Sequence, residues 1–402
     1  MGADGHRRHH GRNGWPVDGW QCAAENVRRR RRRMINLVPR KEIPLSLTLT
    51  TTAVAVALTL IAGAAIFSVL GYDPLAALYQ FFIAPVSRGY QVADLFVKAC
   101  PLIIIASGLV FSYRANVWNI GAEGQMILGA MFSGYVALYW SGMPAPLLLP
   151  VMILAGVLGG LAWAMIPAIL KTRFNTNEIL VSLMLTYVAV LFIDWTVRGP
   201  WRDPMSFGFP LTPMYPDAGM IARVDLPGIG RLAQLHWGVL GALVLSVAAW
   251  FILRRTMVGF QVQVMGDAPR AGRFAGFSPA LVTVLVLGIS GGAAGLAGMV
   301  EVSANIGQLQ PNISFGYGFT AIIVAFLARL NPLGVIVAGL VVALAEMGGD
   351  AAQIAMGIPK VVTGVFKGIL LFMLLAGETF NRFHVEFRLP GTAARAAATA
   401  AA

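Results

Sequence analysis

Residues 146–170 read PLLLPVMILAGVLGGLAWAMIPAIL, an apolar run without a charged side chain. A helix needs about 20 such residues to cross roughly 30 Å of hydrocarbon. In lipid the backbone must also satisfy its own hydrogen bonds, which favours helices over open strands. This run therefore predicts a membrane-spanning helix and defines the pattern to look for in the rest of the chain.

Further apolar runs along the chain indicate that it is an integral membrane protein. The composition agrees, because 57% of the residues are hydrophobic and 12% are charged. The short alternating segments typical of a membrane barrel do not occur in the sequence. We predict an all-α polytopic membrane helical bundle of about ten transmembrane helices. The runs are 45–72, 93–112, 120–141, 146–170, 178–198, 234–253, 279–300, 317–329, 333–348 and 360–376.

These runs divide the chain into a transmembrane domain at 45–380, a basic N-terminal tail at 1–44 and an Ala-rich C-terminal tail at 381–402. The first tail is polar and is expected to be disordered. The net charge of +12 and the six arginines at 28–33 could indicate nucleic-acid binding. A basic cluster just before an apolar run is, however, what the positive-inside rule expects. We therefore predict cytoplasmic termini and no nucleic-acid partner.

The sequence contains no phosphate-binding loop and no HExxH, GxSxG or CxxC motif. Cys22 and Cys100 are too few for a disulfide framework or a metal cluster. We therefore expect no catalytic residue, no metal and no cofactor on this chain. If the protein does thermodynamic work, the energy comes from an ion gradient or from another subunit.

Two segments have a predicted packing role. The stretch GISGGAAGLAG at 288–298 has GxxxG spacing, which predicts close helix contacts. The Pro- and Gly-rich loop at 199–235 is predicted to form an ordered external cap. Its aromatic residues Trp201, Phe207, Phe209 and Tyr215 are suited to the membrane interface.

Polar residues gather in the stretch NVWNIGAEGQ at 116–125, which lies between two apolar runs. Asn119 is expected to cap the third predicted span, with Glu123 one turn further on and favoured there by the helix dipole. Gly121 and Gly124 permit close contact or a bend. This stretch, with Gln125, is either a capping and packing device or a conformational hinge near the cytoplasmic gate.

A second polar group opens the fifth predicted span. Its apolar residues are preceded by Asn175, Thr176, Asn177 and Glu178. The first and last of these have the spacing of a capping box. That spacing explains these residues without a role in transport.

The loop between the sixth and seventh predicted spans carries a short predicted helix at 269–275. Asp267 or Ala268 can cap it, Pro269 suits its first position and Gly276 suits its end. Its side chains include Arg270, Arg273 and Phe274. Such a helix either docks in a groove of a soluble partner or rests on anionic membrane lipid.

Three motifs in this chain resemble one family of transporters. Gly266, Pro269, Ala271, Ala275 and Gly276 form G-x-x-P-x-A-x-x-x-A-G, which resembles the coupling-helix segment of ABC importer permease subunits for nucleosides, simple sugars and branched-chain amino acids. The segment at 98–125, with N-I-G-A-E-G-Q at its end, resembles the nucleoside-type branch of that family, and the segment at 171–189 is also similar to it.

The resemblance implies a type II-like ABC importer permease that moves nucleosides, or related simple sugars, across the membrane. It also implies that 269–275 is the helix that docks on a cytoplasmic ATP-binding subunit, where ATP is bound and hydrolysed. Further implied partners are a second homologous permease subunit and an extracytoplasmic substrate-binding protein.

A path for a nucleoside should present amides, hydroxyls and aromatic rings on bundle-facing helices. Candidate pathway residues are Ser107, Gln125, Ser182, Tyr187, Ser290, Asn305 and Thr320. Each could equally be a packing residue. Glu346 and Lys367 are charged residues within predicted spans, for which an ion pair is one hypothesis and a snorkelling lysine the other.

Two other functions compete with the importer. An ion-coupled secondary transporter acting alone should carry carboxylates at the midplane, whereas Asp194, Glu301, Glu346 and Asp350 are all expected near the outer ends of spans. A membrane scaffold that transports nothing would not explain the coupling-helix motif.

Overall fold

The computed structural model describes residues 35–39, 45–226, 230–314 and 316–387, and these form two compact units. The first unit comprises 1–55 and 376–402, and the second comprises 56–375. In the first unit β1 (Ile35–Pro39) pairs antiparallel with β4 (Phe383–Phe387), which sets Ile35 opposite Phe387. The sequence predicted no strand in these segments. The arginine run at 28–33 and the last Ala-rich residues lie outside the described part of the chain.

Every predicted apolar run coincides with a helix. The corresponding helices are α2 (Leu45–Val69), α4 (Gly89–Arg114), α5 (Ala122–Tyr139), α6 (Ala145–Phe174), α7 (Glu178–Arg198), α8 (Trp237–Arg255), α11 (Pro279–Glu301), α12 (Tyr317–Leu327), α13 (Pro332–Met356) and α14 (Lys360–Arg382). The all-α membrane bundle is therefore confirmed. In the described residues, six helices are long and apolar enough to cross a membrane, namely α4, α6, α7, α8, α11 with the turn that follows it, and α13.

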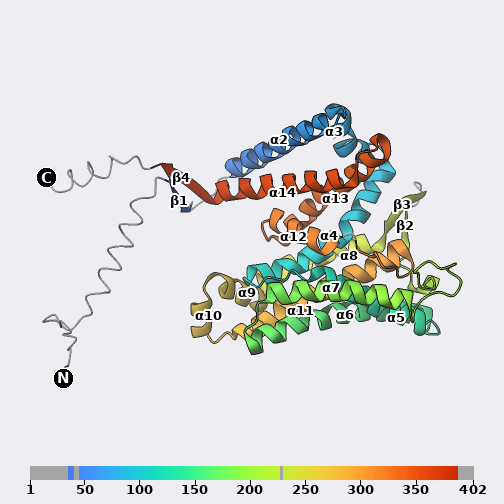
Figure 1. The fold of residues 1–402 in the computed structure, drawn as a ribbon. Coiled ribbons are helices and arrows are strands. Elements are labelled where there is room, and N and C mark those ends of the chain that lie inside the picture. The colour runs from blue at the N-terminus through green and yellow to red at the C-terminus, as the bar shows by residue number, and fades with distance from the viewer. Residues whose placement is uncertain (1–34, 40–44, 227–229, 315, 388–402) are drawn as a thin grey trace, which may run out of the picture. The chain divides into compact units, whose positions relative to one another are not determined.

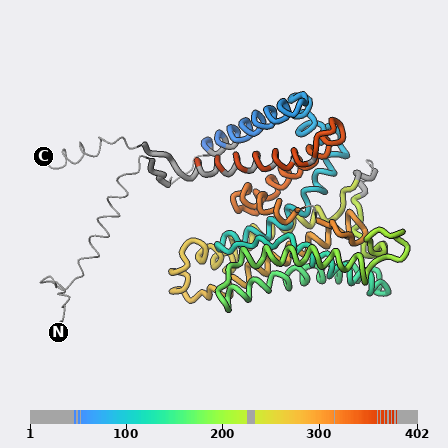
Figure 2. The backbone as a smooth tube through the Cα atoms, viewed as in Figure 1, coloured from blue at the N-terminus to red at the C-terminus, as the bar shows by residue number. Residues whose placement is uncertain are grey.

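Additional elements connect these helices (Figure 1). They are α3 (Pro74–Phe82), the 3-10 turns η1 (Ala84–Val86) and η2 (Asp217–Gly219), the strands β2 (Arg223–Leu226) and β3 (Gly230–His236), α9 (Met257–Asp267), α10 (Pro269–Phe274) and the π-helical turn η3 (Val302–Ile306). Figures 1 and 2 place α10 at one end of the bundle and the β2–β3 hairpin at the other. We refer to these as the α10 end and the hairpin end.

The core of the second unit forms around α11, which packs on α4, α5 and α6. Its small residues make this possible. A Cβ atom at Gly291 would overlap Ala164, one at Gly295 would overlap the Gly156 carbonyl, and one at Gly298 would overlap the Met126 carbonyl. The close helix contacts predicted from the GxxxG spacing are therefore confirmed.

The described residues of the loop at 199–235 are hydrogen-bonded to η3 and to Gly307 after it. The Ile221 amide donates to the Ser303 carbonyl at 3.0 Å, and the Tyr215 amide donates to the Gly307 carbonyl at 2.8 Å. The expectation that Tyr215 lies at the interface was wrong, because its side chain is buried against Gly134. Burial raises the pKa of the Tyr215 phenol above its ordinary range.

Candidate functional site

The stretch NVWNIGAEGQ lies inside the bundle and forms a buried hydrogen-bonded network. The Asn119 amide nitrogen donates to Gln125 Oε1 and to Ser290 Oγ, both at 2.8 Å. Asn119 Oδ1 accepts from Gln125 Nε2 at 3.1 Å and from the Gly121 amide at 3.1 Å. The Tyr113 hydroxyl donates to the Asn119 carbonyl at 3.0 Å. These bonds tie α4, α5 and α11 together at the middle of α11.

The expectation that Asn119 caps α5 was wrong. The N-cap of α5 is Gly121, which makes no side-chain capping bond. Asn119 lies two residues earlier, in the non-helical segment between α4 and α5. Local spacing suggested a cap, but a buried amide must also satisfy its remaining donors and acceptors, and Gln125 and Ser290 satisfy them here.

The two glycines of this stretch bring α5 against α7. A Cβ atom at Gly121 would lie 2.9 Å from Ser182 Cβ, and one at Gly124 would lie 2.9 Å from Thr186 Cα. Ser182 also accepts a hydrogen bond from the Ile120 amide at 3.3 Å. Glycine therefore serves close approach at both positions.

Glu123 caps a different helix from its own. Its Oε1 accepts from the Gly316 amide at 3.1 Å, and its Oε2 accepts from the Gly318 amide at 2.6 Å. These are orphan donors at the start of α12, where a carboxylate is favoured by both hydrogen bonding and the helix dipole. The side chain of Glu123 is 5% exposed. Glu123 also lies in the first turn of α5, as predicted, and it adds a contact between α5 and α12.

Two interrupted segments therefore meet inside the bundle. One is the turn between α4 and α5, and the other is the segment that leads from η3 to α12. With 11 residues, α12 is too short to cross a membrane by itself. Non-helical backbone at membrane depth is tolerated where protein buries it or where it lines a cavity, and such interruptions are typical of transport paths.

The polar corner between α6 and α7 is arranged differently from the prediction. Asn177 is the N-cap of α7, and its side chain accepts from the Ile179 amide at 2.9 Å. Asn175 is instead the left-handed C-cap of α6, with φ of 52°. The capping box between Asn175 and Glu178 was therefore wrong, because the chain reverses at Asn175. Glu178 forms an ion pair with Lys171.

The opposite end of α12 is joined to α4. Arg114 Nε donates to the Leu330 carbonyl at 2.8 Å. Tyr113 and Trp118 stack against Phe326 of α12, with ring centroids 5.0 and 5.7 Å away. The last turn of α4 thus holds the last turn of α12, while Glu123 holds its first turn.

The α10 helix reaches this junction through α9. A Cβ atom at Gly266, one residue before the end of α9, would overlap the Arg114 carbonyl, so the two helices touch through backbone. The predicted short helix is confirmed at Pro269–Phe274, with Ala268 as its N-cap, and Gly276 ends it with φ of 84°. Phe274 is 95% exposed. The other exposed side chains of α10 include Arg270, Ala271 and Arg273, and Ala275 is the C-cap.

A polar cavity of about 470 Å³ opens at the hairpin end. Its lining residues are Pro85, Gln91, Asp94, Val97, Lys98, Gln234, Glu301, Asn305, Tyr317, Met347, Asp350, Ala351 and Ile354. Lys98 Nζ lies 3.7 Å from Asp350 Oδ2, and Asn305 Nδ2 donates to Glu301 Oε2 at 2.8 Å. Tyr317, the first residue of α12, is buried and is among the lining residues of this cavity.

The sequence prediction included Asn305 but missed most of this cavity. Asp94 and Lys98 lie four residues apart at the start of an apolar run, and that spacing places them on one helix face. Charged residues within a span are costly and mark functional sites, so this pair was the available signal. Glu301 and Asp350 line the hairpin end of the bundle with them.

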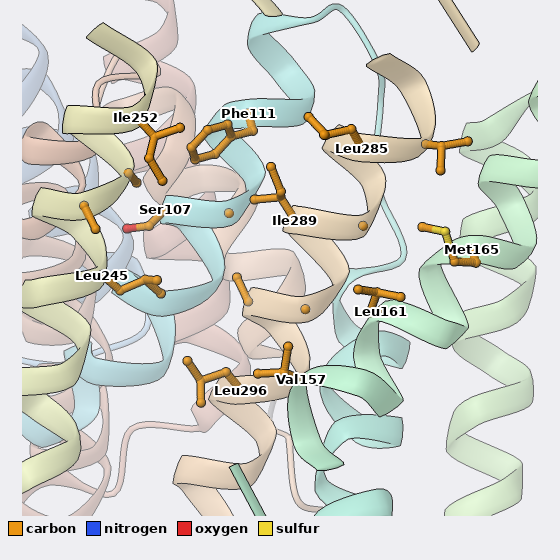
Figure 3. A pocket seen from close by; sticks show the side chains of 17 residues that line it. Ser107, Phe111, Val157, Leu161, Met165, Leu245, Ile252, Leu285, Ile289 and Leu296 are labelled. Atoms are coloured by element: carbon orange, nitrogen blue, oxygen red, sulfur yellow. The ribbon is translucent and has the colours of Figure 1, made fainter. Parts of the chain in front are cut away.

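A second hollow, shown in Figure 3, is almost wholly apolar. This groove of about 490 Å³ lies between α4, α6, α8 and α11, and Gly288 and Gly292 are among its lining residues. Ser107 lies in it, and its hydroxyl has no hydrogen-bond partner among the described residues. The groove suits hydrocarbon rather than a polar substrate.

The predicted pathway residues therefore lie in different parts of the bundle and do not form one site. Ser182 and Ser290 join the Asn119 network, Asn305 lines the polar cavity, and Ser107 lines the apolar groove. Tyr187 is 61% exposed on the surface of α7. Thr320 lies in the first turn of α12, where its amide donates to the Gly316 carbonyl. The proposed ion pair of Glu346 with Lys367 stays a prediction, because the Lys367 side chain lies outside the described part.

Comparison with known proteins identifies the family. Residues 91–375 match the protein family described as the permease component of the branched-chain amino acid transport system. The chain belongs to this family of permeases. The family predicted from the three motifs is thereby confirmed, and the chain is a multi-pass membrane protein of the ABC transporter class.

Individual relatives cover most of the permease. A glucose ABC transporter permease of Haloferax volcanii is 33% identical over 87% of this chain and 93% of its own length. A guanosine ABC transporter permease of Bacillus subtilis is 28% identical over 79% of this chain and 90% of its own. A nucleoside ABC transporter permease of Lactococcus lactis is 24% identical over 82% and 90%.

Proposed function

We propose that this permease is the membrane subunit of an ABC importer that carries nucleosides, or related simple sugars, through the polar cavity at the hairpin end. Relatives named for guanosine, nucleosides and glucose support this substrate class. The observation that carries the proposal is the position of Tyr317. It lines the cavity and is also the first residue of α12, the helix that Glu123 holds in place.

The transport step follows from how α12 is held. Substrate enters the cavity at the hairpin end and meets Tyr317 in its lining. Movement of α10 and α9 displaces the end of α4 through the contact of Gly266 with Arg114. Because Arg114 and Phe326 tie α4 to the last turn of α12, that displacement shifts α12 and with it Tyr317. The substrate then passes toward the α10 end.

The proposed partners are those of an ABC importer. The exposed α10, with Arg270, Arg273 and Phe274, docks on an ATP-binding subunit, where ATP is bound and hydrolysed. A second permease subunit and an extracytoplasmic substrate-binding protein complete the importer. Basic residues toward the α10 end support a cytoplasmic location for that end and for both termini, in a bacterial inner membrane. They are Lys171, Arg173, Arg254, Arg255, Arg270 and Arg273.

The test is uptake by the reconstituted complex. The permease, its ATPase and its binding protein are placed in proteoliposomes with radiolabelled guanosine or glucose outside. We expect uptake that requires ATP inside the vesicles and the binding protein outside them. Ionophores should not abolish this uptake. Uptake that ignores ATP but collapses with the proton or sodium gradient would identify an ion-coupled transporter and overturn the proposal.

The buried carboxylate of Glu123 has a structural role that explains it without ion coupling. Both of its oxygens accept backbone hydrogen bonds from the start of α12. The ATP-driven importer is the function that the relatives and the exposed α10 support best.

A further inference from the structure

We propose that Glu301 and Asn305 bind neighbouring hydroxyls of the substrate's sugar moiety within the polar cavity. This inference rests on the proposed function and deepens it, because it assigns the permease its own specificity site. The observation behind it is a carboxylate and a carboxamide joined to each other, on an interrupted stretch of helix, at the wall of a cavity.

The backbone that carries the pair is irregular. Glu301 is the last residue of α11, and Asn305 follows within the π-helical turn η3, which ends at Gly307 with φ of 81°. Short π-helical turns are rare and occur frequently at functional sites. The hairpin-end loop supports this turn, since the Ile221 and Tyr215 amides donate to the Ser303 and Gly307 carbonyls. Backbone hydrogen bonds to the loop therefore hold the segment that carries the pair.

The hydrogen bonding of the pair leaves an acceptor for a ligand. Asn305 Nδ2 donates to Glu301 Oε2 at 2.8 Å, which fixes the orientation of the amide. Its other polar atom, Asn305 Oδ1, is buried and has no hydrogen-bond partner among the described residues. A buried acceptor without a donor indicates a group that the structure does not contain. A carboxylate beside it adds further acceptor capacity.

This set of acceptors matches a diol. Two neighbouring hydroxyls donate two hydrogen bonds at short separation, one to the carboxylate and one to the amide oxygen. The ring of Tyr317, which lines the same cavity, offers an apolar face beside them. The cavity volume of about 470 Å³ lies within the range of roughly 300–1,000 Å³ that is usual for small-molecule sites.

The charged side chains of the cavity argue against an anionic ligand. Three carboxylates, Asp94, Glu301 and Asp350, outnumber the lysine in the lining, Lys98, whose amine lies 3.7 Å from Asp350. These carboxylates repel an anion, whereas a hydroxyl group can donate a hydrogen bond to a carboxylate. Together with the paired amide of Asn305, this arrangement suits hydroxyl-bearing substrates.

The experiment pairs a protein change with a substrate change. Reconstituted wild-type, Glu301→Gln and Asn305→Ala importers are compared at saturating loaded binding protein. Guanosine is compared with 2′-deoxyguanosine and 3′-deoxyguanosine, or glucose with 2-deoxyglucose and 3-deoxyglucose, according to which the wild type carries. The binding protein contributes the same selectivity to every importer. Its contribution therefore cancels when the rate ratio of a variant is divided by the rate ratio of the wild type.

For each variant we expect the preference for the parent substrate to fall about tenfold relative to the analogue that lacks the hydroxyl bound by the replaced side chain, because that analogue never made the lost hydrogen bond. The preference relative to the other analogue should stay unchanged. Asp194→Asn removes a carboxylate that pairs with Arg198 on the surface of α7, and it should leave both ratios at the wild-type value. An equal fall for the parent and both analogues, or unchanged ratios, would overturn the inference while the proposed function stands. If Glu301→Gln does not assemble, Asn305→Ala alone decides. A wild type without ATP-dependent uptake of any of these compounds would overturn both.

Discussion

The Glu123 carboxylate of α5 accepts a hydrogen bond from the Gly318 amide at the start of α12, at 2.6 Å. A side chain of one helix thus fixes the beginning of another helix that is 195 residues away in the chain. Because Tyr317 precedes Gly318 and lines the polar cavity, the contact joins α5 to a residue of the cavity wall.

Replacing Glu123 should therefore loosen α12. Glu123→Ala leaves the Gly316 and Gly318 amides without acceptors, at about 1–3 kcal/mol for each donor left unsatisfied. Glu123→Gln keeps one acceptor but turns an amide NH₂ toward a backbone donor, so we expect an intermediate loss. Thermal unfolding of the purified complex and uptake in proteoliposomes measure both effects. If Glu123→Ala matches the wild type in both, the contact does not position α12.

The contact between α9 and α4 gives a second prediction. Gly266→Ala would drive a methyl group into the Arg114 carbonyl, so α9 must move away from α4. Such overpacking costs typically about 1–3 kcal/mol, and here it should also raise the number of ATP molecules hydrolysed per substrate transported. Gly241→Ala on α8 is the matched control, because nothing lies within 4 Å of that position. Equal coupling ratios in the two variants would contradict the prediction.

The exposed Phe274 of α10 leads to a prediction about assembly. Phe274→Ala should change permease stability by less than about 0.5 kcal/mol, as is usual at the surface. It should nevertheless weaken binding of the ATPase subunit about tenfold or more, because buried aromatic residues dominate interfaces. Phe207→Ala removes a ring that is 98% exposed and lies in the loop at the other end of the bundle, and it should not affect binding. An unaltered affinity of Phe274→Ala would instead support an α10 that rests on lipid.

The helices of this protein could be predicted closely because hydrocarbon imposes them. For α7 the predicted and observed limits are the same, at 178–198. The helix α9 was not predicted, because its segment mixes polar and apolar residues and forms no continuous apolar run. The end of α13 was placed too early, at residue 348, because Asp350 interrupts the apolar run, although the helix continues to Met356.

The site was harder to predict because its bonds are long-range. Asn119 and Glu123 both have local helical explanations, and capping rules favoured these. Their observed partners, Ser290 and Gly318, are 171 and 195 residues away. Spacing within one helix carries no information about such partners. The motif could therefore indicate the family, while the network that it builds depends on how the helices pack.

The last prediction concerns pH and His236, which ends β3 at the hairpin end. Burial, and then the charge of Arg223 directly across the hairpin, lower the pKa of His236 to about 4 from its ordinary 6.5. The folded protein therefore keeps this imidazole neutral, whereas the unfolded chain binds a proton as the pH falls below 6.5. Its contribution to stability is complete above pH 6.5 and is lost progressively as the pH falls toward 4. We expect the melting temperature to fall over this window and the fall to be smaller in His236→Gln, which cannot titrate. Identical pH profiles for the variant and the wild type would show that another group causes the acid sensitivity.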